Sequence, residues 1–293
     1  MDLALLKTFL QVAETGSFVA ASERLFVTQS AVSLRVHRLE ELLGKQLFTR
    51  SKAGAELTSN GREFEGYALS MVRTWEQARQ QVAVPAGFAR VLIIGAQVTL
   101  WPRIGFRWID ALRAEVPDLG LRAEMGTSEE LTRAMTEGVM QVMLTHTPKV
   151  RPGLSVERLI EDELVLVAPW AGATPDDLAG NYAQVDWGPD FMAFQTQHLP
   201  GLVSSGLTLG IGALATRFAV GQGMAAFLPA AHVKRHVDAG RLHLVEGVPG
   251  FSYPVWSVWR DDLDEDLAGI AHAALQAVAE RTENDIAELL DSL

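Results

Sequence analysis

A short stretch of this chain combines side chains that hydrogen-bond nucleobases with side chains that pair with phosphates. On a helix, with about 100° per residue, one outward face would carry Gln29, Ser30, Ser33, Leu34, His37 and Arg38. Gln and Ser can donate to and accept from base edges, and the Leu34 side chain could lie against a thymine methyl group. Arg35 and Arg38 could neutralise phosphates. This is the chemistry of a DNA-reading helix.

Two capped helices must position that face. Ser17 can cap a first helix, and Thr28, which we include among the residues expected to contact DNA, can cap the second. An apolar stripe in the second helix predicts its buried side: Val32, Val36, Leu39 and Leu43. Gly44 is expected to end this helix.

A basic hairpin is predicted directly after the second helix. Its strands are expected at Gln46–Thr49 and Ala55–Thr58, on either side of a tip at residues 50–54. Arg50 and Lys52 in that tip could contact the DNA backbone or minor groove. The order helix, turn, helix, hairpin predicts a winged helix-turn-helix.

The chain resembles LysR-type transcriptional regulators over residues 20–61, AASERLFVTQSAVSLRVHRLEELLGKQLFTRSKAGAELTSNG. The match holds in order, spacing and residue type, and the length and the downstream pattern agree with the family. Leu34 and His37 depart from it, because family members often carry Arg or Gln at the first position and a basic residue at the second. These two departures bear on the base preference and affinity at those two positions.

The resemblance implies a multidomain fold: an all-α winged helix-turn-helix with a long linker helix, then an α/β effector domain of two periplasmic-binding-protein-like lobes. We assign residues 1–58 to the DNA-binding domain, 59–87 to the linker helix and hinge, and 88–293 to the effector domain. The first lobe would comprise 88–162 and 266–293, and the second lobe 163–265. The chain would cross into the second lobe near Pro169 and return near Tyr253.

Composition limits the class of protein. The chain has 293 residues, 48% of them hydrophobic, and no cysteine, which excludes disulfides, cysteine zinc sites and thiol redox sensing. We find neither a membrane span nor a secretory signal, and we expect a cytoplasmic protein of bacterial type. The net charge of −11 is unevenly distributed: residues 1–90 carry 11 basic and 9 acidic residues, and residues 91–293 carry 14 and 27. The amino-terminal part therefore keeps the local positive charge that phosphate contacts need.

A long helix is predicted from Thr58 to about Val84. Its apolar residues follow a coiled-coil spacing: Phe64, Ala68, Met71, Trp75, Ala78 and Val82. Such a stripe needs a partner, so we expect a homodimer that presents two recognition helices to an inverted-repeat operator. The alternative is that the stripe packs on the chain's own carboxy-terminal domain. The family further implies a homotetramer, a dimer of dimers.

From Arg90 onward, strands alternate with helices, which predicts an α/β fold with a largely parallel sheet. Strands are expected at 91–96, 119–125, 139–144, 163–168, 185–187, 224–228 and 255–259. Helices are expected at 101–115, 128–137, 209–220, 230–238 and 267–290. Thr127 and Glu130 form a capping box for the helix at 128–137.

Polar residues follow three of these strands, where ligands of α/β proteins bind: Gln97 and Thr99, Thr127 and Ser128, Thr145 and His146. By analogy with LysR-type regulators, the interlobe cleft would hold a small-molecule effector, with Thr99 supplying a hydroxyl. Apolar residues in or next to the cleft loops predict an effector with an apolar or aromatic part: Leu100, Trp101, Trp187, Phe191 and Phe194. Two of the expected effector contacts also have a structural interpretation, since Trp101 could be a packing residue and Thr127 a helix cap.

No familiar catalytic or metal signature is present, so we expect no enzyme, cofactor or metal. His232 and His236 are four residues apart on one predicted helix, but the flanking Lys234 and Arg235 favour a solvated face. The expected partners are double-stranded DNA, further copies of the chain, a small-molecule effector and RNA polymerase, with no membrane. The alternatives are an effector-independent regulator, a cytoplasmic solute-binding protein, or an enzyme acting in the cleft.

Overall fold

The computed structural model describes residues 2–51, 54–82, 87–202, 206–210 and 212–290. The chain forms two compact units, one of residues 1–86 with 133–140 and one of residues 87–132 with 141–293. Each unit is considered by itself below. No helix in the described ranges is long and apolar enough to cross a membrane.

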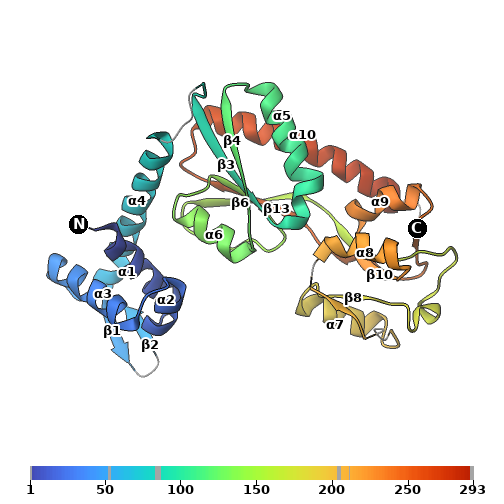
Figure 1. The fold of residues 1–293 in the computed structure, drawn as a ribbon, viewed down its shortest axis with the longest axis horizontal. Coiled ribbons are helices and arrows are strands. Elements are labelled where there is room, and N and C mark those ends of the chain that lie inside the picture. Colours follow the sequence, from blue (N-terminus) through green and yellow to red (C-terminus); the bar gives the residue numbers. More distant parts are fainter. Residues whose placement is uncertain (1, 52–53, 83–86, 203–205, 211, 291–293) are drawn as a thin grey trace. The chain divides into compact units, whose positions relative to one another are not determined.

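The amino-terminal part of the first unit consists of four helices and a hairpin (Figure 1), and the end of the helix at residues 128–136 also belongs to this unit. The elements of the amino-terminal part are α1 (Leu3–Thr15), α2 (Phe18–Arg24), α3 (Gln29–Leu43), β1 (Phe48–Ser51), β2 (Gly54–Leu57) and α4 (Ser59–Val82). The expected caps are present, because the Ser17 hydroxyl accepts from the Ala20 N–H and the Thr28 hydroxyl from the Ala31 N–H. Gly44 ends α3 in the left-handed conformation, with a φ of 64°. These local signals were sufficient to predict α2 and α3.

The predicted stripe of α3 forms the centre of a small core. Val32, Val36 and Leu39 are fully buried among apolar side chains of α1 and α2, but Leu43, at the last turn, is exposed. Three rings complete this core, since Phe9 packs against Phe48 and Phe64 with ring centroids 5.3 Å away in both cases.

The wing is an antiparallel hairpin with Phe48 opposite Leu57 and Ser51 opposite Gly54. The strands lie close to their predicted positions. The wing is docked on the end of α1, where the Ala55 N–H donates to the Gly16 carbonyl at 2.8 Å. A Cβ atom on Gly54 would lie 2.6 Å from that same carbonyl oxygen, so only glycine permits this approach.

The apolar stripe of α4 is divided between two environments, which corrects the prediction of one continuous dimer seam. Ala68 is fully buried and Phe64 is packed in the unit's own core, so these two residues are not available to a second chain. The stripe turns outward after Met71: Trp75 is 51% exposed and Val82 is 89% exposed. The first part of the stripe packs in the unit's own core, whereas the second part leaves large apolar side chains exposed.

The second unit begins with an α/β lobe built on a five-stranded sheet in the order β4-β3-β5-β13-β6. The strands are β3 (Arg90–Ala96), β4 (Leu119–Met125), β5 (Val142–Thr145), β6 (Leu154–Ile160) and β13 (Val255–Arg260). The helical segments are η1 (Val98–Leu100), the π-helical turn η2 (Trp101–Gly105), α5 (Phe106–Glu115), α6 (Ser128–Thr136) and α10 (Glu265–Leu290). The sheet is mixed rather than largely parallel, because β13 pairs antiparallel with both β5 and β6.

The second lobe is built on β7 (Glu163–Ala168), which pairs antiparallel with three other strands. These are β10 (Ala226–Pro229), β11 (His243–Leu244) and β12 (Phe251–Ser252). A separate parallel pair joins β8 (Gln184–Val185) to β9 (Thr208–Leu209). The helices are η3 (Pro175–Leu178), α7 (Pro189–His198), η4 (Gly212–Leu214), α8 (Ala215–Gln222) and α9 (Ala230–Asp238). The helix expected at 209–220 therefore begins later, and α7 was not predicted.

Two short crossovers connect the lobes. The chain leaves the first sheet after Ile160 and enters the second at Glu163, so the first crossover is at residues 161–162 and not near Pro169. The return lies at Tyr253 and Pro254, as expected, and β13 then belongs to the first sheet. The boundary placed at residue 266 was therefore wrong, because residues 255–265 are part of the first lobe.

Candidate DNA-reading surface and interlobe site

The outward face of α3 is arranged as the sequence predicts. Gln29, Ser30, Leu34, His37 and Arg38 are all exposed, Leu34 by 67%, and Ser33 is half-buried. Hydrogen-bonding, apolar and cationic groups therefore lie along one surface that the core leaves free, while the opposite side of the same helix is buried.

The basic residues around this surface differ in how they are held. Arg35 is half-buried, and its guanidinium donates to the Thr8 hydroxyl at 3.4 Å, while His37 lies 3.3 Å from the Glu41 carboxylate. Arg50 of the wing stacks over the Phe18 ring, with 4.0 Å between its Cζ atom and the ring centroid. This stacking orders the side chain while its N–H groups stay at the surface. Lys52, also predicted to contact DNA, lies outside the described residues.

An apolar groove runs between α1 and the second half of α4. It is lined by Leu3, Leu6, Ser70, Met71, Thr74, Trp75 and Ala78. Beside it, Glu76 is buried and pairs with Lys7 and Arg79. Three of the predicted dimerisation residues, Met71, Trp75 and Ala78, therefore lie together on one hollow surface.

A network of polar side chains connects the ends of β3 and β5 with the start of α6. The Gln97 Oε1 atom accepts from the Thr145 hydroxyl at 3.0 Å and from the His146 N–H at 2.7 Å. The Ser128 hydroxyl lies 3.2 Å from that of Thr145 and donates to the Thr147 carbonyl. Four of the six polar residues predicted after these strands, Gln97, Ser128, Thr145 and His146, are thus brought together.

Three rings from both lobes stand beside this network. His146 stacks on Tyr253 with 3.9 Å between centroids, and Tyr253 meets Trp187 edge to face at 5.1 Å. The Trp187 indole donates to the Phe227 carbonyl at 3.0 Å. A Cβ atom on Gly212 would lie 3.3 Å from the Thr99 methyl group, so the two lobes approach closely here. Tyr253 was not predicted as a site residue.

Five predicted effector contacts have other roles in the structure. Leu100, the last residue of η1, and Trp101, the first residue of the π-helical turn η2, are both buried in the main core. Phe191 and Phe194 lie on α7, not in a cleft loop, and pack with Phe227 and Phe251 in the core of the second lobe. Thr127 is an exposed helix cap, whose hydroxyl donates to the Glu130 carboxylate.

The first crossover carries a buried carboxylate that sequence reasoning missed. The Asp162 Oδ1 atom accepts from the backbone N–H groups of Glu163 and Ala231, and its main-chain carbonyl accepts from Tyr253. Asp162 therefore connects both crossovers to the start of α9. Burial raises the pKa of this carboxyl to about 7, although the two N–H donors and the Arg103 charge act in the opposite direction.

Three cationic or titratable side chains, Arg103, His146 and His232, line the same small cavity as Asp162. His232 donates from Nε2 to the Thr99 carbonyl at 3.1 Å, and its Nδ1 atom is buried without a hydrogen-bond partner in the described structure. Burial lowers the pKa values of His232 and His146 to about 4. The expectation of a solvated histidine face on α9 was therefore wrong, since His236 is buried as well. Within the described residues, no group of three or more side chains is placed to hold a metal ion.

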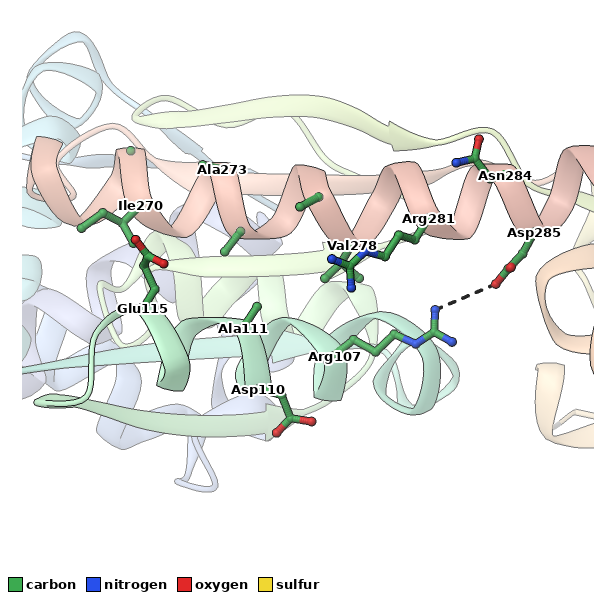
Figure 2. A pocket seen from close by; sticks show the side chains of 13 residues that line it. Arg107, Asp110, Ala111, Glu115, Ile270, Ala273, Val278, Arg281, Asn284 and Asp285 are labelled. Atoms are coloured by element: carbon green, nitrogen blue, oxygen red, sulfur yellow. Dashed lines mark ion pairs between the residues drawn. The ribbon is translucent and has the colours of Figure 1, made fainter.

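The carboxy-terminal helix α10 positions the Arg103 side chain, which lines the same cavity. Figure 2 shows the groove between α5 and α10, in which Arg107 and Asp285 form an ion pair of 3.9 Å. Ala111 and Ala273 line the same groove farther along the two helices. Asp285 also pairs with Arg103 at 3.2 Å. Burial lowers the pKa of the Arg103 guanidinium, and the nearby positive charge of Arg107 lowers it further.

The chain combines a winged helix-turn-helix with a two-lobed α/β domain. This combination defines the class of DNA-binding regulators whose second domain has the fold of a ligand-binding protein. Two family models match the chain: the bacterial regulatory helix-turn-helix protein, lysR family, at residues 3–62, and the LysR substrate binding domain at residues 85–281. The chain belongs to the LysR family of transcriptional regulators.

Individual relatives agree with this assignment. The chain is 31% identical to the HTH-type transcriptional regulator HdfR of Salmonella schwarzengrund over 272 residues, which cover 90% of this chain and 94% of that protein. Full-length LysG from Corynebacterium glutamicum with bound effector Arg shares the fold, with a TM-score of 0.56 and 19% identity over 96% of this chain and 99% of that one. CbnR in complex with its target DNA gives a TM-score of 0.51 and 18% identity over 95% and 100% of the two chains.

Proposed function

We propose that this regulator reads an inverted-repeat operator with the exposed face of α3 and contacts the flanking backbone through its wing. The observation that carries the proposal is the division of α3 into a fully buried stripe and an exposed face of hydrogen-bonding, apolar and basic side chains. CbnR, which shares this fold, has been crystallised with its target DNA. Gln29, Ser30, Ser33 and Leu34 would contact bases, and Arg35, Arg38 and Arg50 would contact phosphates.

The active species in this proposal is a homodimer assembled through α4, with a homotetramer as the complete form. The half-exposed Trp75 ring and the apolar groove beside it support this arrangement, because a side chain of this size gains stability when a partner covers it. A two-fold axis through α4 would present two copies of α3 to two half-sites. RNA polymerase would be a partner at the promoter.

The interlobe site would receive a small-molecule effector. Gln97, Thr99, Ser128 and His146 offer polar groups at strand ends, and Trp187 with Tyr253 offers ring surface, which favours an effector with a polar group and an apolar or aromatic part. LysG holds arginine as its effector. Binding would favour one arrangement of the lobes and thereby change the spacing of the DNA-binding units.

Footprinting tests DNA reading and effector response in one experiment. The purified full-length chain is incubated with its own upstream intergenic DNA at two salt concentrations, with and without a metabolite pool. A two-fold-symmetric protected site that shifts with the pool supports both parts of the proposal. Protection that never responds to the pool would favour an effector-independent regulator, and no specific protection at either salt would contradict DNA reading.

Site variants test the effector contacts separately. Thr99→Val combined with Trp187→Ala should abolish the effect of the pool on the footprint while operator binding without the pool is retained. The matched control is Phe191→Leu, because that ring lies in the second-lobe core and is expected to leave the response intact. A full response in the double variant would remove the interlobe assignment.

A further inference from the structure

The turn between α2 and α3 holds an aromatic residue in an unfavourable backbone conformation. Phe26 has a φ of +53°, and within the described residues it is the one non-glycine residue with a positive φ. In this left-handed region the Cβ atom comes close to backbone oxygen, which costs an ordinary residue roughly 1–2 kcal/mol. Glycine adopts the same conformation freely.

The turn cannot relax out of this conformation, because its backbone is fixed on both sides. The Leu25 N–H donates to the Ala21 carbonyl, the Phe26 N–H to the Glu23 carbonyl, and the Val27 N–H to the Ser22 carbonyl, at 3.0, 3.2 and 3.1 Å. The side chains of Leu25 and Val27 pack on the core of the first unit. The left-handed residue is therefore a requirement of the turn.

The fold makes no use of the Phe26 ring. The residue is 95% exposed, whereas the three other phenylalanines of the helix-turn-helix and wing pack together or on α4. A side chain that strains the backbone and buries no surface stabilises nothing within the unit. Such outliers concentrate at functional sites, where a partner supplies the compensation.

The position of the turn identifies that partner. Phe26 lies two residues before the Thr28 cap and three before Gln29, the first residue of the exposed α3 face. In helix-turn-helix proteins the amino-terminal end of the recognition helix meets base edges, while the preceding helix crosses the DNA backbone. A ring on the turn between these helices is presented to the DNA beside the first turn of α3.

We propose that the Phe26 ring packs on operator DNA, against apolar atoms of a deoxyribose or a thymine methyl group. The contact would add affinity without adding charge, and it would make Phe26 a determinant of binding alongside the α3 face. This inference rests on the proposed reading of DNA by α3. Binding of the wild-type chain to a selected duplex tests that premise independently of any Phe26 variant.

Two substitutions distinguish the contribution of the Phe26 ring from that of the backbone conformation of the turn. The probe is a duplex that the full-length wild-type chain selects from a random-sequence library. Phe26→Asn removes the ring but tolerates the left-handed conformation, and Phe26→Tyr keeps the ring. We expect at least a fivefold loss of affinity for Phe26→Asn, an unchanged dependence on salt, and affinity within twofold of wild type for Phe26→Tyr. Phe26→Asn should also unfold at a higher temperature, because the strain is relieved.

The control is Leu42→Ala, which removes a 61% exposed apolar side chain from the far end of α3 and should leave affinity unchanged. Wild-type affinity in Phe26→Asn, or an equal loss in Phe26→Asn and Phe26→Tyr, would overturn the proposal. Replacing each thymine of the duplex by uracil identifies the contacted atoms. A position where uracil weakens the wild type but not Phe26→Asn assigns the methyl group, and uniform behaviour of the two proteins assigns the sugar.

Discussion

Replacing Asp162 with asparagine should make the stability of the effector domain less dependent on pH. Burial raises the pKa of this carboxyl from 3.8 to about 7. A carboxyl whose pKa is higher in the folded state binds its proton more tightly there, so its contribution to stability grows as the pH falls below 7 and is lost as the pH rises through 7. Asparagine has no such proton, but its carbonyl oxygen can still accept from the Glu163 and Ala231 N–H groups.

The size of the effect follows from the distance between the pH and the folded pKa. At pH 5 the wild-type carboxyl is about two pH units below its folded pKa, and each unit corresponds to about 1.4 kcal/mol, so the wild type should gain roughly 3 kcal/mol of stability relative to pH 8. For a domain of this size that free energy corresponds to about 6–12 °C in the midpoint of thermal unfolding. The variant should lack this gain.

Tryptophan fluorescence of the full-length chain is a suitable assay, because six of the seven tryptophans lie after residue 90. The quantity to compare is the unfolding midpoint of Asp162→Asn minus that of wild type, at pH 8 and at pH 5. A hydrogen bond that the amide fails to make lowers the variant's midpoint at both pH values and cancels in the comparison. The contributions of His146, His232 and the other titrating groups also occur in both proteins.

The unfolding midpoint of Asp162→Asn minus that of wild type should be several degrees higher at pH 8 than at pH 5. Asp110→Asn is the matched control, since that carboxylate is exposed on α5 and the same substitution there should give equal differences at the two pH values. Equal differences for Asp162→Asn would refute the reasoning, because they would mean that the carboxyl titrates alike in the folded and unfolded chain.

Three further results are expected. His146→Phe keeps a ring against Tyr253 but removes a group whose pKa burial lowers from 6.5 to about 4. As the pH falls from 6.5 to 4, the free energy of unfolding of the wild type should decrease by up to about 3 kcal/mol, and that of the variant should decrease less. Acid unfolding followed by circular dichroism measures both. Ala68→Leu should destabilise the first unit by about 1–3 kcal/mol in calorimetry, since it overfills a closed core, whereas Ala78→Leu in the exposed groove should not. Arg38→Ala should reduce the slope of log affinity against log salt by about 1 if it neutralises one phosphate, and an unchanged slope would remove that assignment.

Elements defined by short-range signals could be predicted from the sequence. The caps at Ser17 and Thr28, the glycine stop at Gly44 and the buried stripe of α3 depend on residues within one or two turns of each other. The polar residues at the ends of β3 and β5 could also be predicted, because the ends of parallel strands meet at one edge of a sheet. These features were sufficient to predict the exposed face of α3 and the polar part of the interlobe site.

Features that depend on distant packing could not be predicted in this way. Asp162 is a single acidic residue at a crossover, and it connects the crossover to α9 only because the Ala231 N–H, 69 positions later, donates to it. Strand β6 contains exposed Glu157 and Arg158, which interrupt the alternation expected of a strand. Phe191 and Phe194 follow Pro189, which opens a helix rather than a loop, and the rings fill a core formed by β7 and β10.

The docking of the wing on Gly16 has a consequence for how operators can differ. The Ala55 N–H is bonded to the end of α1, Gly54 leaves no room for a side chain, and the Glu40 carboxylate of α3 accepts from the Leu47 and Phe48 N–H groups, so we expect the wing and α3 to move together. A signal from the effector domain would then move the whole DNA-binding unit and would leave the contacts within each half-site unchanged. Operators under different regulation should accordingly share half-site sequences and vary in the length of DNA between them.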